Sequence, residues 1–454
     1  MCTQNARSDG PRRGSNCNPA CVSTRLAPVS RCCRELATHP ELLPSSLEIT
    51  LASRNRLDVR VASLRHWLER HAAKTGLRQL SLTVKQTVNL REPPALDEGP
   101  QSRRAAAELE AALLAVCGGA GGAQLEVLCL DVQLARPSCI GSSWLPALRG
   151  LTSLELAGDV CQPGAPLHQL AMLRHLALRR DSVLIPLPSQ CHKLSLPAWL
   201  TSLTIVRDYG FELPTAVRHL HFLEELKLEG CTYITNSYNC LPALPALRKL
   251  SMVGCGGLPV CLPELTRLQG LHCEVDYEFF EQREAVEELE DALGSLTQLT
   301  YLRFCDAAAC RDYEEEEDEN DEREPWQRLP SALLGLTQLR TLGWLLPPSD
   351  AALPCGDEDA DGYSGASAAW MSGLRSLALP ADVARRSRGQ LRGAVALEEL
   401  CLTGWEASEK EAQKELLELA WQLPCIQRVA YCSAGPGSAC TKAAGLVAGV
   451  AGGQ

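Results

Sequence analysis

The sequence predicts an α/β solenoid. A curved parallel sheet would form its concave side, and helices, 3₁₀ turns and loops its convex side. Three observations predict this fold. The pattern L-x-x-L-x-L recurs along the chain, its copies are almost evenly spaced, and the apolar residues are mainly aliphatic, with 45% hydrophobic but only 5% aromatic residues. At 454 residues the chain is too long for one ordinary compact core, so it divides into domains or repeats.

The pattern is clearest in LEELKLEGCTYIT, from Leu223 to Thr235. Thirteen copies are present in all. Seven keep every leucine, and six carry a substitution; they start at Leu77, Leu125, Leu151, Leu173, Leu200, Leu223, Leu247, Leu268, Leu299, Leu339, Leu374, Leu397 and Ile426. Starts from Leu125 to Leu268 are 26, 22, 27, 23, 24 and 21 residues apart. This is the period of leucine-rich repeats, about 20–29 residues.

The spacing of the leucines within one copy has a physical explanation. Leu226 and Leu228 are two residues apart on a short strand, so both point to the same face. Leu223 enters the core from the turn before the strand. Three residues after the last leucine the chain must bend away, and a small residue, Cys231 or Cys255, stands there. One coil cannot bury its leucines alone, so stability depends on stacking.

Charge is concentrated in one segment. The net charge is −11, and the run from Asp312 to Glu324 contains ten acidic residues and one arginine. Without this run, 45 acidic residues stand against 43 basic ones. The totals give no strongly basic face, so we expect no nucleic-acid partner.

The cysteines indicate the compartment. There are 22 of them, spread over the whole length, and none forms a C-x-x-C pair. We therefore expect most to be free thiols that act as small buried hydrophobes in a reducing compartment. The N-terminus has no apolar core of the signal-peptide kind. No apolar run approaches the roughly 20 residues of a membrane span. These features predict a cytoplasmic protein with no membrane partner; the nucleus and the ciliary axoneme are the alternatives.

The organisation follows from where the pattern begins and ends. We expect a disordered N-terminus at 1–24, an F-box-like remnant or N-terminal cap at 25–50, the solenoid at 51–433 with an acidic loop at 306–325 and a second loop at 347–369, and a flexible tail at 434–454. The spacing of apolar residues predicts two helices. One covers Val59 to Lys74, and the other contains Val286, Leu289 and Leu293.

Two kinds of repeat resemble known families. LEELKLEGCTYIT resembles the cysteine-containing repeat of F-box leucine-rich-repeat proteins. LGSLTQLTYL and LLGLTQLRTL are similar to the shorter repeat of plants and algae. The resemblance covers about residues 77–433. It implies the solenoid fold and does not specify a function.

A shorter resemblance lies before the repeats. RLAPVSRCCRELATHPELLPSSLEI, from Arg25 to Ile49, resembles the C-terminal half of an F-box, with matches at Val29, Ser30, Arg31, Arg34, Leu36, Ala37, Pro40 and Leu42. Cys33 and Leu43 stand where the family has tryptophan, and the N-terminal half is absent. The resemblance implies binding to the adaptor of a cullin-RING ubiquitin ligase through Val29, Arg31, Arg34, Leu36, Pro40 and Leu42. The alternative is a helix that caps the solenoid.

Motifs for catalysis are missing. The chain has no phosphate-binding loop of the G-x-x-x-x-G-K-[ST] type, no H-E-x-x-H and no G-x-S-x-G. His219 and His221 form an H-x-H without a cysteine pair beside it, and we assign them a surface or packing role. We therefore expect no enzyme activity, no cofactor and no metal.

The predicted binding site is the concave face, where side chains between the core leucines point away from the core. In the best-patterned coils these are His175, Arg179, Glu225, Lys227, Glu229, Lys249, Ser251, His272, Glu274, Tyr301 and Arg303. The mixture of both charges with histidine and tyrosine favours a protein or peptide ligand. Three functions remain open: a monomeric interaction scaffold, a substrate receptor of a cullin-RING ligase, and a structural protein of the cytoskeleton or axoneme.

Overall fold

The computed structural model describes residues 45–432 with gaps, most of which follow a strand. The gaps are 54–55, 72–75, 87–97, 119–123, 135–139, 141, 159–165, 181–194, 208–214, 231–236, 256, 276–282, 307–328, 346–352, 355–369, 404–413, 415, 419 and 421.

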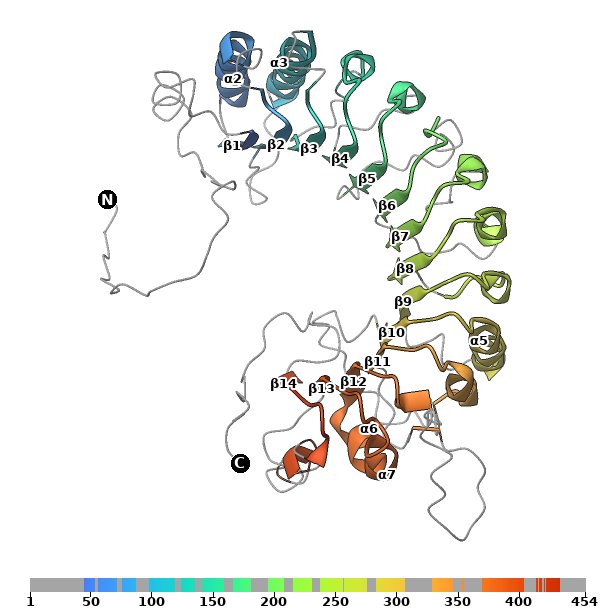
Figure 1. The fold of residues 1–454 in the computed structure, drawn as a ribbon. Helices are drawn as coiled ribbons and strands as arrows, with labels where there is room; N and C mark the ends of the chain where they lie inside the picture. Colours follow the sequence, from blue (N-terminus) through green and yellow to red (C-terminus); the bar gives the residue numbers. More distant parts are fainter. Residues whose placement is uncertain are drawn as a thin grey trace, which may run out of the picture.

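The described residues form one parallel sheet of fourteen strands whose order follows the sequence, β1 to β14. Figure 1 shows the sheet as an arc, with the strands along its inner side and the helices outside. The strands are β1 (Ser46–Ser53), β2 (Gln79–Gln86), β3 (Val127–Gln133), β4 (Ser153–Gly158), β5 (His175–Arg180), β6 (Ser202–Arg207), β7 (Glu225–Glu229), β8 (Lys249–Val253), β9 (Gly270–Val275), β10 (Tyr301–Asp306), β11 (Thr341–Leu345), β12 (Ser376–Pro380), β13 (Glu399–Thr403) and β14 (Arg428–Cys432). The leucine-rich-repeat solenoid predicted from the sequence is therefore confirmed.

Strand register places the repeated leucines in rows. Leu226 of β7 aligns with Leu203 of β6 and Leu250 of β8, and all three are buried. The backbone fixes this register in the same way from coil to coil. The carbonyl of Arg174, just before β5, accepts the N–H groups of Thr201 (2.9 Å) and Ser202 (3.0 Å) from the next coil. Each of the thirteen copies of the pattern forms one strand, from β2 to β14.

The sheet begins earlier than the sequence predicts. Strand β1 starts at Ser46, and its Leu47, Ile49 and Leu51 alternate into the core. The expected start at 51 was wrong because Pro44 stands where other coils have their first leucine, which hides the repeat. The last four residues of the F-box-like stretch, 46–49, are thus a solenoid strand. The rest of it, 25–44, lies outside the described residues.

The convex layer changes along the solenoid. It contains α2 (Leu57–His71), α3 (Glu98–Gly118), η3 (Leu145–Ala147), η4 (Leu167–Gln169), η6 (Thr215–His219), η7 (Ser237–Ala243), η8 (Leu262–Glu264), α5 (Arg283–Ser295), η10 (Ser331–Gly335), α6 (Ala381–Arg386) and α7 (Arg388–Leu391). The described parts of the repeats between Leu125 and Leu268, which are 21–27 residues long, contain only 3₁₀ turns, whereas α2, α3 and α5 lie in longer repeats. The 23-residue repeat from Leu374 to Leu397 is an exception, because it contains the short helices α6 and α7. Helices α2 and α5 confirm the two predicted helices, and Leu289 and Leu293 of α5 are buried.

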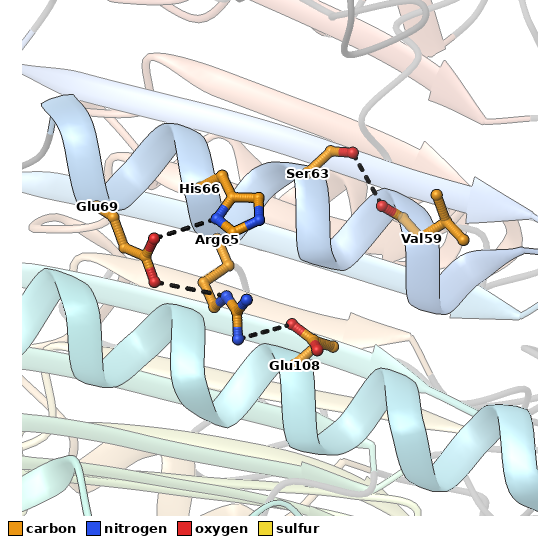
Figure 2. A network of polar contacts seen from close by, with 6 residues as sticks. All are labelled: Val59, Ser63, Arg65, His66, Glu69 and Glu108. Atoms are coloured by element: carbon orange, nitrogen blue, oxygen red, sulfur yellow. Dashed lines mark hydrogen bonds and ion pairs between the residues drawn. The ribbon is translucent and has the colours of Figure 1, made fainter.

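The two N-terminal helices, α2 and α3, pack side by side and share an ion-pair network (Figure 2). Arg65 of α2 is 3.5 Å from Glu69 on its own helix and 3.2 Å from Glu108 of α3. His66 contacts the other oxygen of Glu69 at 3.2 Å. Because these side chains are partly exposed, we assign the network a small share of the stability and a role in fixing how the helices align.

The two expected loops fall largely in the gaps. The acidic loop at 306–325 lies outside the described residues apart from Asp306, as do the N-terminus and the tail. Of the second expected loop, 347–369, the structure describes only residues 353 and 354. Its Leu353 and Pro354 are buried, and the Leu353 N–H donates to the buried Ser387 hydroxyl at 2.8 Å. Within the described ranges, no helix is long and apolar enough to cross a membrane.

The described cysteines are free thiols, and most are buried. Burial raises the pKa of Cys117 to about 12 and that of Cys261 to about 11. The pKa of the fully buried Cys273 is also well above its ordinary value, because burial disfavours its thiolate. These thiols are packing groups, as the sequence predicts.

Alkylation should separate the buried thiols from the exposed one. At pH 8, iodoacetamide is expected to modify the exposed Cys425 and leave Cys117, Cys261 and Cys273 unmodified, because reaction requires an accessible thiolate. Peptide mapping by mass spectrometry would measure this, with the urea-unfolded chain as the control in which all four react. Native modification of Cys273 at the rate of Cys425 would contradict this burial.

Candidate functional site

The strands place the residues predicted for the concave face on that face. The residues predicted to contact an adaptor lie outside the described part of the chain: Val29, Arg31, Arg34, Leu36, Pro40 and Leu42. Strand β7 is typical: Leu226 and Leu228 are buried, while Glu225, Lys227 and Glu229 lie outside the core. The same alternation exposes or partly exposes His175, Arg179, Lys249, Ser251, His272, Glu274, Tyr301 and Arg303. Their location follows from the two-residue period of a strand. Their role in binding stays a prediction.

Ion pairs cross the concave face between neighbouring strands. Arg179 of β5 lies 2.7 Å from Glu155 of β4, and Lys85 of β2 lies 3.1 Å from Asp131 of β3. Lys227 is 3.2 Å from Glu229 on the same strand. These pairs leave both signs of charge exposed on this face.

His272 is a described group on this face whose pKa is strongly lowered. Its Nδ1 shares a 3.3 Å hydrogen bond with the Ser251 hydroxyl of the neighbouring strand. Burial lowers the pKa of His272 to about 4, and the positive charges of Arg303 and Lys227 act in the same direction. The imidazole is therefore neutral at physiological pH, a hydrogen-bonding group between two cations.

This lowered pKa predicts a pH-dependent stability. Below about pH 6.5 the unfolded chain protonates His272 while the native state does not until about pH 4, so stability falls as pH drops through this window. Urea unfolding at pH 7 and pH 5 would measure it. We expect wild type to lose about 1–2 kcal/mol more than His272→Gln between the two values. Equal losses would contradict the low pKa of His272.

Towards its C-terminal end the concave face contains a hollow of about 280 Å³ over strands β10 to β14. The space is open because the middle outward-facing position of each of four successive strands carries a small residue. These residues are Gly343, Ala378, Cys401 and Ala430. Tyr301, Arg303, Glu399 and Arg428 also line the hollow.

The arginines give the hollow its polarity. The aliphatic part of the Arg303 side chain lies over Gly343. A Cβ at position 343 would be 3.1 Å from the Arg303 Cγ, so the glycine leaves room for Arg303 to cross strand β11. Its Nε donates to the Cys305 sulfur at 3.2 Å. Arg428 pairs with Glu399 on the adjacent strand. Burial raises the pKa of Cys401 although both arginines act in the opposite direction, so this thiol is protonated at neutral pH.

The concave-face residues predicted from the sequence end at Arg303, so they do not include the far half of this hollow. Thr341, Ser376, Glu399 and Arg428 occupy the same outward position as Tyr301 in the four following coils. The leucine pattern starting at Leu339, Leu374, Leu397 and Ile426 contains the signal that would have found them. Among the described residues, no cluster of three or more His, Cys, Asp or Glu residues could hold a metal.

Together the sheet and its leucine rows define a leucine-rich-repeat solenoid, the class of protein that this structure represents. No protein-family profile and no curated protein matches the chain. A leucine-rich-repeat protein of Leptospira interrogans is similar in structure, with a TM-score of 0.39 and 15% identity over 85% of this chain and 97% of that one. TLR13, in its complex with ssRNA13, gives 0.40 and 14% over 84% of this chain and 50% of that one.

Proposed function

We propose that the protein is a non-enzymatic interaction scaffold that holds a protein or peptide ligand on its concave face. The main support for this proposal is the hollow over β10 to β14, which the described side chains leave open. Arg303, Glu399 and Arg428 line it and offer both signs of charge, and Tyr301 adds an aromatic ring. Tyrosine and arginine are the residue types that most often dominate the energy of protein interfaces.

Charge reversal on this face tests the proposal. In the variant Lys227→Glu with Arg303→Glu, the thermal unfolding midpoint should stay nearly unchanged, because both side chains are partly exposed and such charges contribute about 0–1 kcal/mol each. Proteins retained from a lysate by the wild-type chain should be lost by this variant. The control is Arg385→Glu on the convex helix α6, which should retain them. Retention of the same proteins by all three chains would contradict binding on the concave face.

A second candidate function rests on the F-box-like stretch Arg25–Ile49, whose resemblance implies a substrate receptor of a cullin-RING ligase. A pull-down with the F-box adaptor would test it, comparing the full chain with one that lacks residues 1–44. The cut falls at 44 because a longer deletion would remove Leu47 and Ile49 from the core. Binding lost on truncation would support the receptor; no binding by either chain would exclude it. A role in the cytoskeleton or axoneme stays a prediction, which co-sedimentation with microtubules would check.

A further inference from the structure

Three large apolar side chains occupy the same position in three successive coils. Met172, Trp199 and Phe222 each precede the first leucine of the pattern, in the coils of β5, β6 and β7. The turn is the same each time: the leucine N–H donates to the carbonyl three residues earlier, at 3.1 Å for Leu173, 3.3 Å for Leu200 and 3.0 Å for Leu223. The three side chains therefore stack one coil apart, and we call them the flank stripe.

The flank stripe is exposed to solvent. Met172 is 49% exposed and Phe222 is 63% exposed. Trp199 between them is partly buried, and its Nε1 donates to the Leu170 carbonyl of the preceding coil at 3.1 Å. The equivalent residues on either side are Gly150 and Ala246, so the stripe ends there. Single exposed apolar residues are normal on a protein surface, but here three large apolar residues occupy the same position in successive coils.

A hollow of about 520 Å³ continues the same surface beyond Phe222. It is lined by His221, Pro245, Ala246, Arg248, Arg267, Gln269 and Gln298. These residues come from the turns just before β7 to β10, which shows that this row of turns forms one flank of the solenoid, separate from the concave face. Arg267 rests on the hollow's edge, where it donates to the Pro245 carbonyl at 3.1 Å.

The charge of this flank is opposite to that of the whole chain. In the turns that precede β4 to β10, the four residues before each strand include Arg149, Arg174, Arg248 and Arg267 but only one carboxylate, Glu224. The full chain, in contrast, has a net charge of −11. An apolar stripe bordered by arginines is complementary to a segment that combines apolar and acidic side chains, because arginine pairs well with carboxylates.

The distances between the three side chains of the flank stripe indicate the secondary structure of the partner segment. Neighbouring strands lie about 4.8 Å apart, so the ends of the stripe are separated by about 10 Å. A helix places residues i and i+4 about 6 Å apart along its axis, and residues i and i+7 about 10.5 Å apart. We propose that this flank is a second docking surface whose partner is an acidic amphipathic helix of another protein, with apolar residues at i, i+4 and i+7 over Met172, Trp199 and Phe222.

Two synthetic helical peptides would test the proposal by fluorescence anisotropy with the full-length protein. Both have 18 residues with leucine at the i, i+4 and i+7 positions; one has glutamate on its polar face, and its twin has lysine. The glutamate peptide is expected to bind at least tenfold more tightly. Met172→Ser and Phe222→Ser should each weaken its binding about tenfold without changing thermal unfolding, because both side chains are exposed.

Matched controls decide between this surface and others. Val260→Ser and Val395→Ser remove apolar residues that are 70% and 50% exposed elsewhere, and they should leave binding unchanged. The concave variant Lys227→Glu with Arg303→Glu should also bind normally. Equal binding of both peptides, or loss only in the concave variant, would overturn the proposal. Two further outcomes would assign the flank to another partner and so overturn the proposal. One is a dimer seen by light scattering that Phe222→Ser abolishes. The other is a labelled oligonucleotide that binds more tightly than the glutamate peptide and is weakened by Arg248→Ala.

Discussion

Replacing Leu226 with alanine is expected to lower the free energy of unfolding by about 2–5 kcal/mol. Leu226 is fully buried between Leu203 and Leu250, in the middle of an uninterrupted row. Removing its side chain leaves a cavity that the stacked coils cannot easily close, because the hydrogen-bonded register on both sides fixes their separation. Urea unfolding followed by circular dichroism would measure the loss.

Lys227→Ala is the matched control for Leu226→Ala. It truncates the next residue of the same strand, on the opposite face, and removes a partly exposed pair with Glu229 and one of the positive charges that act on His272. Its expected cost is at most about 1 kcal/mol. Similar losses for the two variants would show that the inward and outward faces of β7 are assigned incorrectly.

Gly158→Ala is expected to be comparably damaging, for a different reason. Gly158 ends strand β4 with a φ of +76°, and a Cβ there would lie 2.0 Å from the Val132 carbonyl oxygen of the neighbouring strand. The left-handed backbone costs a residue with a Cβ about 1–2 kcal/mol. The clash with backbone adds about 1–3 kcal/mol, because β3 must move. We expect a total loss of about 2–5 kcal/mol, measured by urea unfolding.

Gly76→Ala separates the two contributions. Gly76 also has a positive φ, +58°, but the nearest atom to its Cβ would be the Gln124 Oε1 at 3.5 Å, an ordinary contact. Only the backbone cost of about 1–2 kcal/mol should remain. If Gly76→Ala destabilised the protein as much as Gly158→Ala, the close approach of Gly158 to Val132 would not be the cause.

The leucine pattern predicts most of this fold because each copy carries its own burial signal. The alternation that buries Leu226 also exposes Lys227, so the outward residues followed from the same pattern. Helix α3 was not predicted, although Leu109, Leu113 and Val116 are buried at helical spacing, because apolar residues on its exposed side, such as Ala107 and Leu114, obscure that spacing in the sequence. Strand β1 was missed because Pro44 interrupts the pattern.

The hollow and the flank stripe could not be predicted in the same way. The hollow depends on Gly343, Ala378 and Cys401 standing beside one another, although each is more than 20 residues from the next. The flank stripe likewise joins Met172, Trp199 and Phe222, none of which is unusual alone. Aligning the copies of the leucine pattern identifies these positions in the sequence, but the open space of the hollow and the exposure of the stripe follow only from the structure.

The order of the sheet, β1 to β14 without a crossover, has a mechanical consequence. The strands pair only with their neighbours in sequence. The total curvature of the arc in Figure 1 is therefore the sum of many small angles between neighbouring coils. Such a solenoid is elastic, since a slight change in the angle between each pair of neighbouring coils adds up to a large change in the distance between its two ends. A ligand that touches only β7 and β8 would leave this elasticity intact. One that reaches from β2 to β13 would act as a brace and stiffen the whole arc.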